Sequence, residues 1–184
     1  MSDGMLTAPL GPEDHYEGPA EAPVVLVEYG DYECPDCGRA HEVVQAVLAE
    51  LGDEVRFVFR NFPLAQAHPQ AEIAAAAAES VARHGGNDAF WAMHDLLFAN
   101  QDALEELDLL SYAEAAGVDP VAVANDLSDG SMRARVRADF RGGVRSGVNG
   151  TPTFFVNGRR FDGNWSDPSA FADALRAAAR VCVH

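Results

Sequence analysis

Hydrophobic and polar positions follow two different periods along this chain, and the changes between them mark its organisation. Two runs rich in β-branched and aromatic residues, residues 24–29 and 54–60, are typical of short strands. Between them, residues 40–51 carry apolar side chains at the spacing of a helix. The first third of the chain therefore predicts a strand, a helix and a second strand.

The next stretch, residues 69–147, is helical in its pattern throughout. Glycines, prolines and capping side chains divide it into four or five helices. Strand signals return at residues 153–156 and 159–161, where Asn157 and Gly158 between them are the signal of a type I′ turn. Pro168 then opens a last helix.

This order predicts an α/β fold in which a helical insertion separates a βαβ half from a ββα half. We assign residues 21–66 and 148–184 to the two halves of one domain and residues 67–147 to the inserted helical subdomain. Residues 1–20, rich in proline, glycine and acidic side chains, are interpreted as a flexible acidic segment.

The composition of the chain excludes some classes of binding partner. The chain of 184 residues is 48% hydrophobic, enough for a full core, and its net charge of −16 disfavours binding to nucleic acid. The first twenty residues lack the basic and apolar regions of a signal peptide, and no apolar window reaches the length of about eighteen residues that a membrane helix needs. We therefore expect a cytoplasmic protein with no membrane partner.

Cys34-Pro35-Asp36-Cys37 is the most informative motif, because two cysteines three positions apart at a helix start can alternate between dithiol and disulfide. Free backbone N–H groups at a helix start favour the Cys34 thiolate, the form that attacks disulfides. Cys37, one turn later, is placed to resolve the mixed disulfide. The Asp36 carboxylate disfavours a negative charge on the neighbouring Cys34 sulfur. We therefore expect Cys34 to be less acidic than the same cysteine in strongly oxidising proteins with a basic or neutral residue at this position.

Two further positions extend this site. Glu28 lies inside the apolar first strand, where burial raises the pKa of a carboxyl and suits a base that accepts the proton of Cys37; a glutamate that reaches solvent from the strand end is the alternative. Thr151-Pro152 stands directly before the strand at residues 153–156, where proline is tolerated and a cis peptide bond is plausible.

Together, the first strand, the C-P-D-C motif and the segment from Gly147 to Gly158 resemble the DsbA-like branch of the thioredoxin superfamily. The resemblance covers about residues 22–180 and implies a thioredoxin-like sheet flanked by helices. It also implies the roles of five residues. Cys34 would be the exposed nucleophile and Cys37 the resolving cysteine, Pro152 the cis-proline facing them, Thr151 the residue that tunes substrate release, and Glu28 the buried acid.

The same pair of cysteines is also half of a zinc site, which needs two more ligands. The chain has no second C-x-x-C, and Cys182 lies near the C-terminus, where packing or fraying is the expected fate. The six histidines offer no ligand pair at zinc spacing along the sequence; they are His15, His41, His68, His84, His94 and His184. We therefore expect no metal and no organic cofactor.

The sequence thus predicts a thiol:disulfide oxidoreductase that reduces or isomerises protein disulfides. The predicted catalytic residues are Cys34, Cys37 and Glu28. The predicted substrate-binding residues are Thr151, Pro152, Pro35 and Asp36. Its expected partners are protein or peptide disulfides and a redox partner that recycles the dithiol. Two alternatives stay open: a thiol peroxidase or glutathione-dependent enzyme, and a peptide-binding module whose cysteines are regulatory or bind metal.

Overall fold

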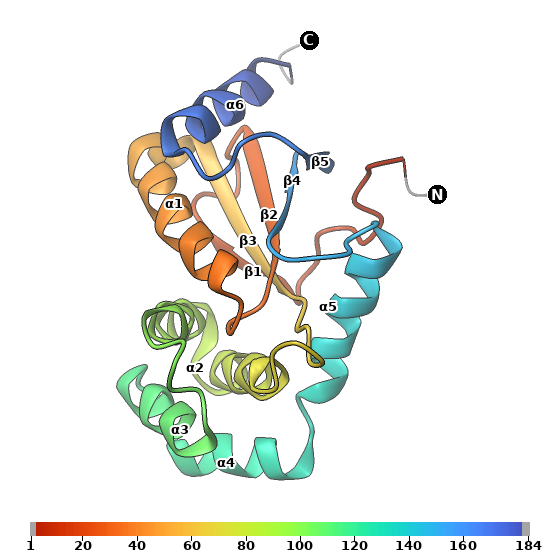
Figure 1. Ribbon diagram of the computed structural model, residues 1–184. Coiled ribbons are helices and arrows are strands. Elements are labelled where there is room, and N and C mark those ends of the chain that lie inside the picture. Colours follow the sequence, from red (N-terminus) through yellow and green to blue (C-terminus); the bar gives the residue numbers. More distant parts are fainter. Residues whose placement is uncertain (1–2, 182–184) are drawn as a thin grey trace.

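A mixed sheet lies at the centre of the computed structural model, which describes residues 3–181 (Figure 1). Its order is β1-β3-β2-β4-β5; β2 and β3 run parallel and the other neighbours antiparallel. The strands are β1 His15–Glu17, β2 Val24–Gly30, β3 Val55–Asn61, β4 Thr153–Val156 and β5 Arg159–Phe161.

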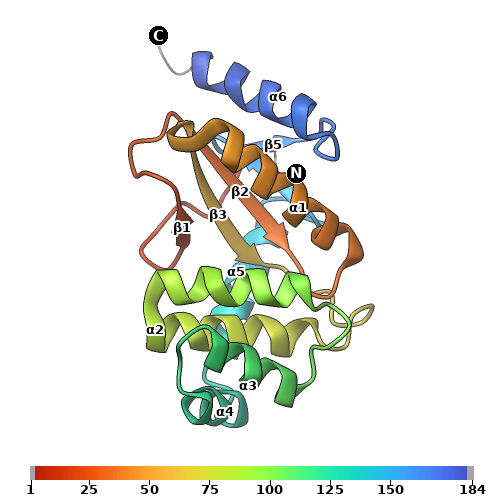
Figure 2. The ribbon, with the colours of Figure 1, turned by 90° about the vertical axis from the view of Figure 1, so that its left-hand side faces the viewer.

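Helices cover both faces of the sheet and form a separate group beyond one end of it (Figures 1 and 2). Helices α1 and α6 pack on one face, α5 packs on the other, and α2, α3 and α4 make the separate group. The helices are α1 Pro35–Leu51, α2 Ala71–Ala99, α3 Glu106–Ala115, α4 Pro120–Asp129, α5 Arg133–Arg145 and α6 Pro168–Val181, with a short 3-10 turn, η1, at Gly52–Glu54.

This architecture confirms the predicted α/β fold. Helix α1 connects the parallel strands β2 and β3, as a parallel pair requires. The predicted turn at Asn157 and Gly158 joins β4 to β5, and both residues have the positive φ angles, 47° and 79°, that a type I′ turn needs. The predicted second strand is displaced by one residue, because Glu54 belongs to the 3-10 turn η1.

Alternation along β2 decides which residues meet the active-site helix. Leu26 packs in the core that α1 and α6 share, whereas Val27 and Tyr29 pack in the smaller core beneath α5. Since side chains alternate between the faces of a strand, Glu28 shares the face of Leu26 and lies beneath α1. The register of one strand therefore places a carboxyl under the start of α1.

Helix α2 consists of two segments that fold back on each other at Gly86 (Figure 2). Gly86 has φ 81° and ψ −168°, a conformation open to glycine and costly for other residues. Gly86 is thus one of the glycines that divide the predicted helical stretch, residues 69–147, into separate helices. Ala74 to Ala78 of the first segment are all buried against neighbouring elements.

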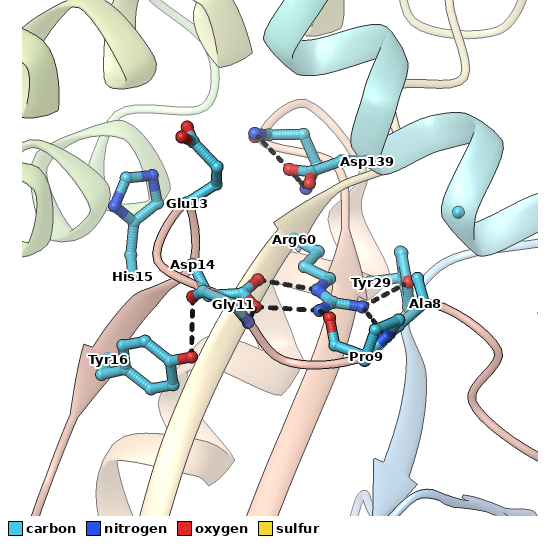
Figure 3. A network of polar contacts seen from close by, with 12 residues as sticks. Ala8, Pro9, Gly11, Glu13, Asp14, His15, Tyr16, Tyr29, Arg60 and Asp139 are labelled. Atoms are coloured by element: carbon cyan, nitrogen blue, oxygen red, sulfur yellow. Dashed lines mark hydrogen bonds and ion pairs between the residues drawn. The ribbon is translucent and has the colours of Figure 1, made fainter. Parts of the chain in front are cut away.

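The interpretation of residues 1–20 as a flexible segment was wrong for residues 5–17, which contact the rest of the fold. Residues 15–17 form the edge strand β1, and Figure 3 shows the preceding turn bound to Arg60 of β3. The Arg60 guanidinium donates to both carboxylate oxygens of Asp14, at 2.8 and 2.9 Å, and to the carbonyls of Ala8 and Pro9. Such a short, proline-flanked strand has no alternation of its own, and its partner β3 determines its conformation.

None of the helices within residues 3–181 combines the length and the apolarity needed to cross a lipid bilayer. Cys182 and His184 lie outside the described residues.

Candidate active site

Both cysteines of the predicted motif lie where β2 gives way to α1, and the structure holds them as free thiols. Cys34 is the N-cap residue of α1, with extended backbone angles, and Pro35 occupies the first helical turn. Cys34 is 6% exposed and Cys37 0% exposed. Both cysteines are thus buried, and Cys34 is the one of the pair that keeps some exposure to solvent.

Thr151, more than a hundred residues away along the chain, closes the other side of Cys34. The Cys34 thiol donates to the Thr151 carbonyl oxygen, with 3.7 Å between sulfur and oxygen. The peptide bond between Thr151 and Pro152 is cis. Pro35 and Asp36 are exposed at the rim of the site, so four of the residues predicted from sequence surround the reactive sulfur.

The pKa of Cys34 is lowered from its ordinary value of 9.0 to about 5. The hydrogen bond from the Cys37 side chain is the largest cause; burial opposes it, and the Thr151 side chain and the backbone N–H groups of Cys37 and Asp36 add to the lowering. Cys34 is therefore a thiolate at neutral pH. The four backbone N–H groups that a helix leaves unsatisfied at its start explain why this position stabilises an anion.

Asp36 does not oppose this thiolate in the way its sequence position indicated. Its carboxylate forms an ion pair with the Arg39 guanidinium one turn along α1, and 53% of its side chain is exposed. A solvated and paired carboxylate has a weak effect on a neighbouring charge. The Cys34 pKa is therefore set at about 5 by the groups that contact its sulfur, and the comparison with strongly oxidising relatives stays a prediction.

Cys37 and Glu28 form the buried side of the site. Burial raises the pKa of the Cys37 thiol, and its hydrogen bond to Cys34 raises it further. Burial likewise raises the pKa of Glu28 from 4.5 to about 8, with a further contribution from the charge of Cys34. Glu28 is 2% exposed, and its Oε1 atom has no hydrogen-bond partner in the described part of the chain. A proton acceptor with a pKa near neutrality therefore lies beneath the two sulfurs.

Asp31 and His68 belong to the same site, and the sequence assigned no role to Asp31. The side chain of Asp31 is fully buried, its backbone N–H donates to the Cys37 sulfur at 3.4 Å, and its Oδ2 lies 2.8 Å from Nδ1 of His68. Although burial lowers the pKa of His68, the bond to Asp31 outweighs it, and the net shift is upward. The signal available in the sequence was a carboxylate directly after a buried strand.

Gln101, in the turn between α2 and α3, is a second contact that the sequence did not reveal. Its amide nitrogen donates to the carbonyl oxygens of Cys34, at 2.8 Å, and of Tyr32, at 2.9 Å. Gly38 makes room for this amide, because a Cβ atom there would lie 2.3 Å from the Gln101 oxygen. The inserted helices thus hold the loop that carries the nucleophile.

A cavity of about 530 Å³ opens beside this loop. Pro35 forms part of its wall, together with Glu33, His68, Gln70, Gln101, Asp102, Leu104 and Glu105. A groove next to an accessible thiolate gives an extended polypeptide room to lie against the site.

Comparison with known proteins agrees with this geometry. A family model described as thioredoxin matches residues 11–176. The Na(+)/H(+) antiporter NhaA 1 of Salinispora arenicola is 46% identical over 97% of this chain, but the chain spans only 26% of that protein. The chain thus covers about a quarter of the length of the curated relatives it matches.

Two solved structures share the fold. Oxidised BdbD from Bacillus subtilis superposes with a TM-score of 0.85 at 24% identity, over 97% of this chain and 99% of that one. The α-DsbA1 protein of Wolbachia pipientis superposes with a TM-score of 0.79 at 18% identity, over 97% and 96% of the two chains. With its family model, its fold and its paired cysteines in agreement, the chain belongs to the thioredoxin family and has the fold of the DsbA-like branch.

Proposed function

We propose that the protein exchanges disulfides with polypeptide substrates through Cys34 and Cys37. The observation that carries this proposal is the pairing of a Cys34 thiolate, the more exposed of the two sulfur-bearing residues, with a fully buried, protonated Cys37. A nucleophile that is ionised at neutral pH and a resolving thiol held in reserve are the two components that thiol–disulfide exchange needs.

The chemistry proceeds in two balanced steps. The Cys34 thiolate attacks one sulfur of a substrate disulfide, so that a mixed disulfide forms and the other substrate sulfur leaves as a thiolate. Glu28 then takes the proton of Cys37, and the Cys37 thiolate attacks the Cys34 sulfur. The products are a Cys34–Cys37 disulfide and a fully reduced substrate, and the reverse sequence transfers the disulfide to a substrate.

The lowered pKa of Cys34 bears on the direction of this exchange. It stabilises the reduced pair and makes Cys34 a good leaving group, both of which weaken the pair as a reductant. The raised pKa of Cys37 slows resolution and leaves the mixed disulfide open to attack by the substrate's own thiols. Of reductase and isomerase, we therefore favour the isomerase.

Replacement of Cys34 and Cys37 by serine tests the proposal. We expect Cys34→Ser to abolish reactivation of a protein with scrambled disulfides, and Cys37→Ser to accumulate mixed disulfides that are visible on a non-reducing gel. Full reactivation by Cys34→Ser would exclude the proposal. Equilibration with glutathione buffers gives the reduction potential, and a potential near that of thioredoxin, about −270 mV, would indicate the reductase instead.

A Na(+)/H(+) antiporter is a proposed partner, because relatives with that name contain a region 46% identical to this chain within a much longer polypeptide. Recovery of an antiporter from cells together with the tagged Cys37→Ser protein, as a disulfide-linked complex that a reductant separates, would support a redox contact between the two.

We also propose that the protein described here works in the cytoplasm. Two of the three cysteines form the exchange pair, so no second pair remains for a structural disulfide.

A further inference from the structure

Outside the active site, α1 and the second segment of α2 bring three ligand-type side chains together. His41 comes from α1, and His94 and Asp95 come from α2. One ring nitrogen of each histidine and one carboxylate oxygen of Asp95 lie within 4.8 Å of one another. The Nε2 atom of His41 is 3.5 Å from Oδ1 of Asp95. The two histidines are far apart along the chain, which is why sequence spacing did not reveal this cluster.

The surroundings of His94 engage one of its two ring nitrogens. The side chain is 1% exposed, and its Nδ1 atom shares a hydrogen bond of 3.0 Å with the Tyr32 hydroxyl. Within residues 3–181 no hydrogen-bond partner is found for its other nitrogen, Nε2, and the ring is otherwise enclosed by Phe59, Trp91 and Phe98. Because Nδ1 is engaged by Tyr32, Nε2 is the ring nitrogen of His94 that remains available to coordinate a metal.

The local charge also favours a cation. Oε2 of Glu17, on β1, is buried without a hydrogen-bond partner in the described chain, and the charge of Asp95 adds to the burial that raises the Glu17 pKa. No arginine among residues 3–181 pairs with Glu17 or Asp95. Burial lowers the pKa of both His41 and His94, and the neutral imidazole is the form that binds metals.

We propose that His41, His94 and Asp95 bind a divalent late transition metal of the Zn²⁺ class, with water completing the coordination. Two histidines and a carboxylate form a known zinc ligand set, and ligand bonds of about 2.0–2.1 Å place tetrahedral ligand atoms about 3.3 Å apart. The His41–Asp95 separation of 3.5 Å is already close to that value. Asp95, whose side chain is 57% exposed, leaves an entry path from solvent.

The Tyr32 hydroxyl has a positioning role in this proposal. When a metal occupies Nε2 of His94, Nδ1 carries the proton and donates to the Tyr32 oxygen, which fixes the tautomer and the ring orientation. The metal would connect α1 to the inserted helices and stabilise the folded chain in proportion to its concentration. The proposal does not depend on disulfide exchange, because neither Cys34 nor Cys37 is a ligand.

The test uses the full chain with Cys182→Ser and with Cys34 and Cys37 oxidised to a disulfide, so that no thiolate competes for metal. We expect Zn²⁺ to bind with one-to-one stoichiometry in calorimetry, and Co²⁺ to give the visible absorption of a four-coordinate site. His41→Ala should abolish both signals, and Asp95→Asn, at an exposed position, should weaken binding without affecting folding. Tyr32→Phe should raise the Kd by about 10- to 100-fold.

His84→Ala is the matched control, because His84, on the first segment of α2, is a half-buried histidine paired with Asp126 of α4. It should retain the one-to-one stoichiometry and the Kd of the parent. Circular dichroism verifies that each variant is folded. Absence of stoichiometric Zn²⁺ binding, binding that survives both His41→Ala and Asp95→Asn, or binding lost equally in His84→Ala would overturn the proposal.

Discussion

At the scale of single residues, the reactivity of Cys34 comes from its neighbours rather than from its own type. The thiol of Cys37, the side chain of Thr151 and the backbone N–H groups at the start of α1 all lower the pKa of one sulfur. Cys37, of the same chemical type and three positions away, is shifted in the opposite direction because burial dominates there. Two identical side chains thereby take the distinct roles of nucleophile and resolving thiol.

The thiolate absorbance of the reduced protein should titrate with a midpoint of about pH 5. Because the Cys37 hydrogen bond is the largest cause of this low pKa, Cys37→Ala should raise the midpoint toward 9.0, the ordinary value of a cysteine. Absorbance at the thiolate band, followed against pH, measures both. Cys34→Ser is the control and should show no transition near pH 5; an unchanged midpoint in Cys37→Ala would contradict the assignment.

Glu28 should make stability depend on pH. Its folded pKa of about 8 exceeds its unfolded value of 4.5, so folding retains a proton that the unfolded chain releases once the pH exceeds 4.5. The resulting penalty is absent below pH 4.5, grows by about 1.4 kcal/mol per pH unit, and levels off above pH 8. We expect Glu28→Gln to gain up to about 3 kcal/mol in free energy of unfolding at pH 7.

Urea unfolding of the reduced protein between pH 4 and pH 8 measures this gain. The two proteins should differ least at the acidic end and most near pH 8. A gain that is the same at every pH would show that the substitution acts through packing and not through ionisation of Glu28.

At the scale of elements, α1 and the turn after α2 hold each other through Gly38 and Gln101. Glycine in a helix ordinarily costs about 0.5–1 kcal/mol relative to alanine. Here the added Cβ of Gly38→Ala would displace the Gln101 amide and break its bonds to the carbonyls of Tyr32 and Cys34, each worth about 1 kcal/mol. The contact between the two elements thus outweighs the helix propensity of one residue.

Gly38→Ala should therefore lower the free energy of unfolding in the native background. In a Gln101→Ala background, where the obstructing amide is absent, the same substitution should raise it by about 0.5–1 kcal/mol. Urea unfolding of the four proteins measures this change of sign. Stabilisation by Gly38→Ala in both backgrounds would contradict the contact.

At the scale of the whole molecule, the chain closes around its sheet through the segment before β1. Residues 8–14 bind Arg60, whose side chain is 5% exposed, as is that of its partner Asp14 (Figure 3). The same guanidinium donates to the Tyr29 hydroxyl at 3.0 Å. One buried cation therefore connects the N-terminal segment, β2 and β3.

Removing one partner of this buried pair leaves an uncompensated charge, so Asp14→Asn should cost about 3–5 kcal/mol in unfolding free energy. The double variant with Arg60→Met should be less destabilised than the sum of the single variants. Arg176→Met, at the more exposed pair with Glu50, is the matched control and should change the unfolding free energy far less, because solvent screens an exposed ion pair. A loss in Asp14→Asn no larger than in the control would refute the role of the segment.

The sequence alone determined most of the fold and the core of the site, because its signals are local. These signals are the hydrophobic periodicity, the turn residues Asn157-Gly158 and the spacing of the two cysteines, and each acts within a few residues. The structure has the helices, strands and turn that they predict. The placement of Glu28 beneath the cysteines also followed from a local rule, the alternation of a buried strand.

Only the tertiary structure decided the contacts between distant segments. Four features join residues from separate elements. They are the pairing of β1 with β3, the Asp31–His68 pair, the hydrogen bonds of Gln101 to the loop before α1, and the cluster of His41, His94 and Asp95. The ion pair between Asp36 and Arg39 on the exposed surface of α1 is likewise a contact that the sequence did not predict. Charge and coordination depend on distances in space, which residue spacing along a chain does not determine.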